Sequence, residues 1–311
     1  MSEFDWIKRY FAPLAASQGA SGLRDDVAEL SRAEGRMIAT VDAVVEGVHF
    51  LPGADEADVA AKLVAVNASD IRVKGGRPCE ALLTLGWPQD RGEDEISAFA
   101  AALGGALADV GAVLVGGDTV TSPHGIFASL TLTGECAQGP TIRRSGARPG
   151  DDVWLSGEIG HGMIGLADAQ RQADTASARH YLRPRIISQA LSDRIAQEAS
   201  ASLDVSDGLL GDALKLAEAS GVQLRLELND VPLADPACEK VTLIEQVTGG
   251  EDFCALFTAP AGRRAKLETW AEAAGERLAR IGATSTGSGL ALLRGGNPQP
   301  LPEKLGFTHG Q

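Results

Sequence analysis

The stretch that most constrains how this chain can fold is residues 203–212, which read Leu-Asp-Val-Ser-Asp-Gly-Leu-Leu-Gly-Asp. Apolar residues then recur at helical spacing up to Gly221, so the pattern predicts a strand end, a tight turn and a helix. Strand alternation places Asp204 and Ser206 on one face, with Asp207 at the turn. Two carboxylates about 4 Å apart repel by roughly 4 kcal/mol at an effective dielectric of about 20. The turn therefore needs either helix capping and solvation of these charges or a bound divalent cation.

Acidic residues beside apolar, strand-like runs recur through the chain, often next to glycine. The further positions are Asp25-Asp26, Asp42, Asp70, Asp118 and Glu251-Asp252. Loops at strand ends on a rigid sheet are common places for functional sites, and we expect most of these residues at such strand ends. Any one of these carboxylates could be a solvated turn or a helix cap, but their recurrence favours one shared site.

The residue types of this acidic set indicate phosphate chemistry with magnesium. Mg²⁺ prefers a few carboxylates together with water and the oxygens of substrate phosphates, so the set predicts several Mg²⁺ ions that clamp a phosphate chain. The formal net charge of -14 would repel a polyphosphate that came without metal ions. The basic, turn-rich segment 142–150 offers Arg143 and Arg144 as direct phosphate contacts.

The composition is that of an ordinary soluble globular protein. The chain has 311 residues, of which 44% are apolar and 23% charged, enough for a large core and two domains. The negative net charge argues against nucleic acid or an anionic membrane as a partner. The cysteines form no CxxC pair, which indicates reduced thiols rather than a zinc site. The charged N-terminus does not resemble a signal peptide, and no apolar stretch is long enough to span a membrane, so we expect a cytoplasmic protein.

Strand-like and helical patterns alternate in both halves of the chain, which predicts an α/β fold. The turn-rich segment 142–150 is the best candidate for a domain boundary. We therefore expect an N-terminal domain over residues 1–140 and a C-terminal domain over residues 141–311.

Other catalytic motifs are poorly represented. Residues 160–165 match GxGxxG after a predicted strand, but the following sequence lacks the second strand with a terminal acid that a dinucleotide site needs. A glycine-rich turn from strand to helix explains this stretch better than a Rossmann site. The chain also contains no Walker loop, no GxSxG elbow, no HExxH pair and no EF-hand spacing.

Seven motifs together resemble those of a known family. They are Leu23-Arg24-Asp25-Asp26; Asp42 with Glu46-Gly47-Val48-His49-Phe50; Asn67-Ala68-Ser69-Asp70; Gly116-Gly117-Asp118-Thr119; Arg144-Ser145-Gly146-Ala147-Arg148-Pro149-Gly150-Asp151; Asp204-Val205-Ser206-Asp207-Gly208; and Gly249-Gly250-Glu251-Asp252. In order and spacing they resemble the thiamine-monophosphate kinase family, within the larger group that contains aminoimidazole ribonucleotide synthetase. The resemblance implies a two-domain α/β (α+β) fold and a homodimer whose N-terminal sheets join in a barrel. It also implies that the N-terminal domain binds ATP and several Mg²⁺ ions, while the C-terminal domain completes the cleft.

The resemblance implies roles for the matched positions. Those similar to Mg²⁺ ligands are Asp25, Thr40, Asp42, Asp70, Asp118, Asp204 and Asp207. Those similar to ATP contacts are Gly117, Asp118, Arg144 and Ser206, and those on the thiamine phosphate side are His49, Glu251 and Phe307. The positions implied to support catalysis are Asp42, Asp118 and Asp207.

The activity implied by the resemblance is transfer of the γ-phosphoryl group of ATP to thiamine monophosphate. One alternative is a sister enzyme of the larger group that uses ATP to activate an oxygen or a carbamoyl group. Another is a catalytically silent protein that binds thiamine phosphates or nucleotides. The intact aspartate set argues against the silent protein, whereas Arg24 and Val41, which depart from the usual family pattern, argue mildly for it.

Overall fold

The computed structural model of the protein describes residues 6–16, 36–137, 139–235 and 241–307. The chain divides into two compact units. The N-terminal unit comprises Met1–Arg72 and Gly76–Ala137, and the C-terminal unit comprises Val73–Gly75 and Gln138–Gln311. Each unit contains its own β-sheet.

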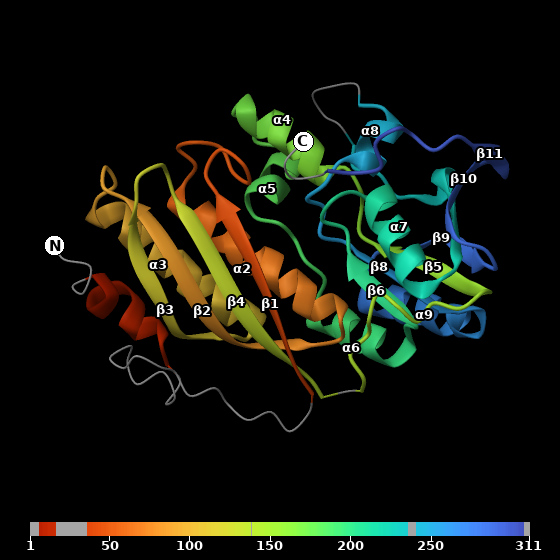
Figure 1. The fold of residues 1–311 in the computed structure, drawn as a ribbon, viewed down its shortest axis with the longest axis horizontal. Helices are drawn as coiled ribbons and strands as arrows, with labels where there is room; N and C mark the ends of the chain where they lie inside the picture. Colours follow the sequence, from red (N-terminus) through yellow and green to blue (C-terminus); the bar gives the residue numbers. More distant parts are fainter. Residues whose placement is uncertain (1–5, 17–35, 138, 236–240, 308–311) are drawn as a thin grey trace. The chain divides into compact units, whose positions relative to one another are not determined.

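Within the described residues, the sheet of the N-terminal unit has four strands in the order β1-β4-β2-β3. The strands are β1 (Arg36–Val45), β2 (Arg77–Pro88), β3 (Val113–Ser122) and β4 (Phe127–Cys136). β4 pairs antiparallel with β1 and β2, whereas β2 and β3 are parallel. The helices α2 (Glu56–Val73) and α3 (Glu93–Val110) cover one face of this sheet (Figure 1). The short helices η1 (Ile7–Phe11) and η2 (Ala12–Leu14) precede it.

The two faces of this sheet differ in their side chains. The face toward α2 and α3 is apolar and buried, as the alternation along β2 and β4 requires. We call the opposite face the outer face. It exposes large apolar side chains, namely Met37, Val41, Val120 and Phe127. Val41 is 62% exposed and Val120 is 50% exposed, which is unusual for a strand residue of this type.

In the described part of the C-terminal unit, the sheet has seven strands in the order β11-β10-β7-β9-β5-β8-β6. Their bounds are β5 (Asp151–Ser156), β6 (Ala201–Asp204), β7 (Gln223–Glu227), β8 (Ala255–Pro260), β9 (Leu278–Ser285), β10 (Gly289–Arg294) and β11 (Asn297–Gln299). The helices are α4 (His161–Gln170), α5 (Ala176–Leu182), α6 (Gln189–Glu198), α7 (Leu209–Ser220), α8 (Leu243–Thr248) and α9 (Arg264–Ala274), with short turns η4 (Leu228–Asp230) and η5 (Ala261–Arg263).

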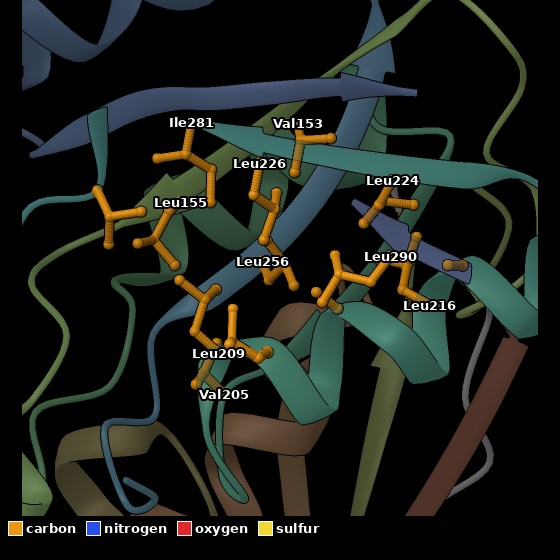
Figure 2. Packing of buried hydrophobic residues seen from close by; sticks show 14 of the residues in the cluster. Val153, Leu155, Val205, Leu209, Leu216, Leu224, Leu226, Leu256, Ile281 and Leu290 are labelled. Carbon is orange, nitrogen blue, oxygen red and sulfur yellow. The ribbon is translucent and has the colours of Figure 1, made fainter. Parts of the chain in front are cut away.

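This sheet is covered on both faces, so its interior strand β5 is buried along its whole length. Val153 and Leu155 point toward the cluster that α7 completes with Leu209 and Leu216 (Figure 2). Trp154, which alternates with them, belongs to a second cluster that includes residues of α6 and α9. Helices on both faces of the sheet explain why Val153, Trp154 and Leu155 are apolar in succession instead of alternating with polar residues.

The structure confirms the expected α/β architecture and a glycine-rich turn from strand to helix. Gly157 and Gly160 lie in the turn between β5 and α4, whereas residues 161–165 already belong to α4. Both sheet neighbours of β5 are antiparallel to it, so this glycine-rich turn does not belong to a parallel dinucleotide-binding unit. The expectation that the aspartates follow strand ends is wrong for Asp42 and Asp118. These two residues lie inside β1 and β3, which are edge strands whose polar side chains can reach solvent.

Two further observations concern the expected cellular setting. Within the residues that the structure describes, none of the helices has the length and apolar character needed to cross a bilayer. Cys79, Cys136 and Cys254 carry free thiols, and Cys238 lies outside the described residues.

Candidate active site

In the N-terminal unit, β1 and α2 bring together the predicted metal-side residues Thr40, Asp42 and Asp70. Thr40 Oγ1 donates to Asp70 Oδ2 at 2.5 Å, and the Asp42 amide donates to Asn67 Oδ1 at 2.9 Å. Asn67 and Asp70 are three residues apart on α2, so they lie on one side of the helix. Asn67 is fully buried, and its Nδ2 donates to Leu63 O at 2.9 Å. Its amide therefore fixes β1 against α2 and holds the two aspartates on adjoining elements.

His49 lies in the turn that follows β1. The Val45 amide donates to His49 Nδ1 at 3.1 Å, so the neutral ring carries its proton on Nε2. The buried Lys62 donates from Nζ to the His49 carbonyl at 2.7 Å. Glu46, in the same turn, accepts from the Ile126 amide at 2.9 Å. These hydrogen bonds hold the turn on both sides and so fix the position of His49, the predicted contact to thiamine monophosphate.

Asp118 lies on the outer face, whereas Asp42 lies on the face toward α2. Asp118 pairs with Thr84, Thr84 pairs with Ser129, and Ser129 pairs with Ala43. Paired residues in a sheet point to the same face, and successive residues point to opposite faces. The strands β1 and β3 are also three strand spacings apart, about 14 Å. A single N-terminal unit therefore does not bring Asp118 beside Asp42.

Two predicted ATP contacts have clear backbone roles. A Cβ atom at Gly117 would lie 2.0 Å from the Leu83 carbonyl oxygen, so the close approach of β3 to β2 requires glycine there. Arg144 is exposed on the segment that precedes β5. Its carbonyl accepts from Ser220 Oγ at 2.9 Å, which fixes the backbone of this segment against the end of α7.

In the C-terminal unit, residues 205–207 use all of their backbone hydrogen-bonding groups. The Val205 amide donates to the Cys254 carbonyl, and the Ser206 and Asp207 amides both donate to the Asp212 carboxylate. The carbonyls of Val205, Ser206 and Asp207 accept from the amides of Phe253, Glu251 and Phe307, in that order. All six distances are 2.8–3.0 Å. This loop follows β6, which ends at the buried Asp204. The structure therefore brings the backbones of the predicted residues Glu251 and Phe307 against the fixed loop that carries Ser206 and Asp207.

The side chain of Asp207 is paired with a cation and does not cap α7. Lys215 Nζ donates to both Asp207 Oδ2 and Asp212 Oδ1, and the N-cap residue of α7 is Gly208, which has no side chain to act as a cap. The helix-capping explanation for Asp207 is thus wrong. Burial acts to lower the pKa of Lys215, but its hydrogen bonds to the two carboxylates outweigh burial and raise it. Burial raises the pKa of Asp212, and Lys215 opposes that rise.

The two acidic residues of the Glu251-Asp252 pair have different environments. The fully buried Asp252 accepts hydrogen bonds from the Gly160 and Gly162 amides at 3.0 Å, at the start of α4. Burial raises the pKa of Asp252 to about 7, although these backbone bonds oppose the rise. Glu251 and Phe253 on either side have φ values of +67° and +49°, which non-glycine residues seldom adopt. Asp252 anchors this strained turn, while Glu251 remains partly exposed.

Asp25 lies outside the described residues. Within the described ranges, no group of three or more His, Cys, Asp and Glu side chains is arranged to hold a metal ion by itself. The carboxylate and hydroxyl oxygens of Thr40, Asp42, Asp70 and Asp207 still suit Mg²⁺, because this ion commonly takes one or two carboxylates and completes its shell with water and substrate phosphates.

Sequence reasoning missed the residues that hold the predicted ligands in place, which are Lys62, Asp212 and Lys215. Lys62 interrupts the apolar side of α2 between Val59 and Leu63, and a lysine at such a position signals a buried partner. Asp212 and Lys215 have the i, i+3 spacing of a helical ion pair. Nothing in the local sequence indicates that Asp212 also accepts from the two residues before the helix.

Comparison with known proteins places this architecture in a class. The family of AIR synthase related proteins matches the chain twice, with its N-terminal domain over residues 24–136 and its C-terminal domain over residues 148–293. The two units and their acidic strand and loop residues are thus those of an AIR synthase related protein.

Individual relatives narrow the class. The thiamine-monophosphate kinase of Caulobacter vibrioides is 37% identical over 328 residues, which span 99% of this chain and 91% of that protein. The crystal structure of thiamine-monophosphate kinase from Stenotrophomonas maltophilia K279a matches with a TM-score of 0.82 and 31% identity, over 96% of this chain and 98% of that one. AaThiL, solved in complex with AMPPCP and TMP, matches with a TM-score of 0.78 and 29% identity, over 98% and 95%. The chain belongs to the thiamine-monophosphate kinase family.

Proposed function

We propose that this chain transfers the γ-phosphoryl group of ATP to thiamine monophosphate and so forms thiamine diphosphate. The observation that carries the proposal is the match over almost the full length to AaThiL, which was solved with AMPPCP and TMP. Identities of 34–37% to thiamine-monophosphate kinases of three bacteria support the same activity.

The acceptor determines what the protein has to supply. A phosphate oxygen is ionised at neutral pH, so it needs no general base. The main obstacle is repulsion between two phosphate chains that must approach in line. Mg²⁺ ions bound through Asp25, Asp42, Asp70, Asp118, Asp204 and Asp207 would offset this repulsion. The chain itself contributes orientation, because Thr40 holds Asp70 and the fixed loop holds Asp207.

The remaining predicted residues divide between the two substrates. We assign Gly117, Arg144 and Ser206 to ATP, with the Arg144 guanidinium pairing with phosphate oxygens. We assign His49, Glu251 and Phe307 to thiamine monophosphate. In support, the backbone amides of Glu251 and Phe307 donate hydrogen bonds to the carbonyls of Ser206 and Asp207. A direct transfer between bound substrates needs no covalent nucleophile on the protein.

The decisive experiment is an assay for thiamine diphosphate after incubation with ATP, Mg²⁺ and thiamine monophosphate. Asp42→Asn should lower kcat by roughly a hundredfold, as expected for loss of a major electrostatic group. Asp109→Asn, which changes an exposed aspartate on α3, is the matched control and should leave kcat unchanged. After incubation with γ-labelled ATP alone, the protein should carry no label.

Other outcomes would favour the alternatives. Binding of both substrates without product would indicate a silent binding protein. Consumption of ATP only with a different acceptor would indicate a sister enzyme of the AIR synthase related class.

We also propose that the protein acts as a homodimer in the cytoplasm, with no nucleic acid or membrane partner. The exposed apolar side chains of the outer face support a partner surface there, and a second sheet joined to this face would form the barrel expected from the family. The use of ATP supports a cytoplasmic location, because that is where this co-substrate is abundant.

A further inference from the structure

We propose that Asp212 is a positioning residue for phosphoryl transfer, because its carboxylate sets the backbone of Ser206 and Asp207. This inference rests on the proposed function, in which Ser206 contacts ATP and Asp207 supports Mg²⁺. Asp212 itself is only 1% exposed, so it acts through these two residues and does not touch the substrates.

The geometry of the Asp212 carboxylate is specific. Oδ2 accepts from the Ser206 amide at 3.0 Å and from the Asp207 amide at 2.9 Å. Oδ1 accepts from Lys215 Nζ at 2.8 Å. One oxygen therefore orders the loop, while the other is compensated by a cation, so that a buried charge becomes tolerable.

The position of these amides explains why the loop needs such an acceptor. They immediately precede Gly208, whose φ of +118° turns the chain into α7. They lie between β6 and α7, and their acceptor is a side chain rather than a backbone carbonyl of either element. On the opposite side, the carbonyls of Ser206 and Asp207 accept from Glu251 and Phe307. The loop is therefore held from two directions. The Asp212 carboxylate binds its amides, and the Glu251 and Phe307 amides bind its carbonyls.

Holding the loop has a consequence for the reaction. Catalytic groups must be held close to their productive geometry, and small displacements lower the rate strongly. With the amide side released, the Asp207 carboxylate and Ser206 hydroxyl would sample several orientations. The loss should fall on kcat and on the affinity for Mg·ATP, with the KM for thiamine monophosphate less affected.

The test compares Asp212→Ala and Asp212→Asn with Asp152→Ala. Asp152 is an equally buried carboxylate of the C-terminal unit, bonded to Arg264 at 2.7 and 2.8 Å. It pairs with Ala259 on β8, whereas Asp204 pairs with Ala255 at the other end of that strand, about 13 Å away. Asp152→Ala should therefore remove a buried charge pair without touching the loop.

Hydrogen exchange in the substrate-free protein is the first readout. Asp212→Ala should speed amide exchange in a peptide covering residues 203–209 at least tenfold, and Asp152→Ala should not change it. Unchanged protection of this peptide in Asp212→Ala would overturn the proposal. This readout does not depend on any activity, so it stands even if the proposed function is wrong.

Kinetics is the second readout. Asp212→Ala should lower kcat at least thirtyfold, and Asp212→Asn, which keeps an acceptor oxygen for both amides, should retain at least ten times the kcat of Asp212→Ala. A kcat for Asp212→Ala within threefold of the Asp152→Ala value would contradict the proposal, as would equal losses in the two Asp212 variants. Absence of product from the unaltered protein would instead refute the proposed function.

Discussion

The backbone amide of Phe307 donates a hydrogen bond to the carbonyl oxygen of Asp207 at 2.8 Å. The two residues are far apart in the sequence, yet this bond attaches the end of the described chain to the loop after β6. Ser206, one residue earlier, accepts from the Glu251 amide in the same way. One loop therefore organises the predicted metal, ATP and acceptor residues of the C-terminal unit.

This relationship predicts the effect of Gly306→Ala. A Cβ atom at Gly306 would lie 2.6 Å from the Asp207 carbonyl oxygen, so the tail would have to move and the Phe307 bond would break. A net hydrogen bond contributes about 1 kcal/mol, or roughly fivefold in an equilibrium. We expect the KM for thiamine monophosphate to rise about fivefold with a smaller change in kcat, measured by steady-state kinetics.

The control for Gly306→Ala is Gly262→Ala. No heavy atom lies within 4 Å of a Cβ placed at Gly262, so this variant should match the unaltered protein. An unchanged KM in Gly306→Ala would show that the tail does not contribute to acceptor binding.

The hydrogen bond to His49 Nδ1 predicts how this residue tolerates change. In His49→Asn, the side-chain oxygen can replace Nδ1 as the acceptor for the Val45 amide, while the Nε2 donor is lost. The turn should keep its conformation, and thermal stability should change little. We expect the KM for thiamine monophosphate to rise about fivefold to tenfold, with kcat within threefold. A variant that binds the acceptor normally but has lost turnover would show that His49 takes part in proton transfer.

The outer face predicts a dimer that a single charge can disrupt. Val120 is 50% exposed on this face, and an aspartate buried there between two sheets without a bound cation would be strongly unfavourable. The unaltered protein should sediment as a dimer at micromolar concentration, and Val120→Asp as a monomer. Leu301→Asp, at an apolar residue of the C-terminal unit with 46% exposure, should remain dimeric. A monomeric mass for the unaltered protein would refute the proposed assembly.

The buried Asp252 predicts a pH dependence of stability. Its pKa is raised from 3.8 to about 7 in the folded protein, so between these values the folded state holds a proton that the unfolded state has lost. Stability contributed by this residue is therefore present below about pH 4 and falls as the pH rises to about 7. At about 1.4 kcal/mol per pKa unit, the loss is of the order of 4 kcal/mol.

Urea unfolding of the unaltered protein and Asp252→Asn, measured from pH 4 to pH 8, would isolate this effect. The free energy of unfolding of the unaltered protein should fall relative to that of the variant as the pH rises to about 7, and then stay level. A difference that does not depend on pH, or that grows in favour of the unaltered protein, would contradict the raised pKa.

Local sequence patterns determined a large part of this protein. Apolar periodicity and Gly221 define α7, since the helix runs from Leu209 to Ser220 and ends at that glycine with φ of +66°. The motif spacing was sufficient to assign the family and hence the two-domain α/β fold. These properties follow from the sequence because short-range sterics, hydrophobic periodicity and motif order depend only on the identity and order of residues along the chain.

Only the tertiary structure decided how the acidic residues are used. The sequence placed Asp207 and Asp252 in the same acidic set, yet Lys215 pairs with Asp207, and the backbone amides at the start of α4 bind Asp252. The sequence did not single out Asp212, which the structure places between Lys215 and the loop after β6. Asp118 likewise lies on the face of its sheet opposite Asp42, which depends on strand order and register. The physical reason is that the environment of a carboxylate depends on partners distant in the chain, and strand pairing and helix docking, rather than local sequence, select those partners.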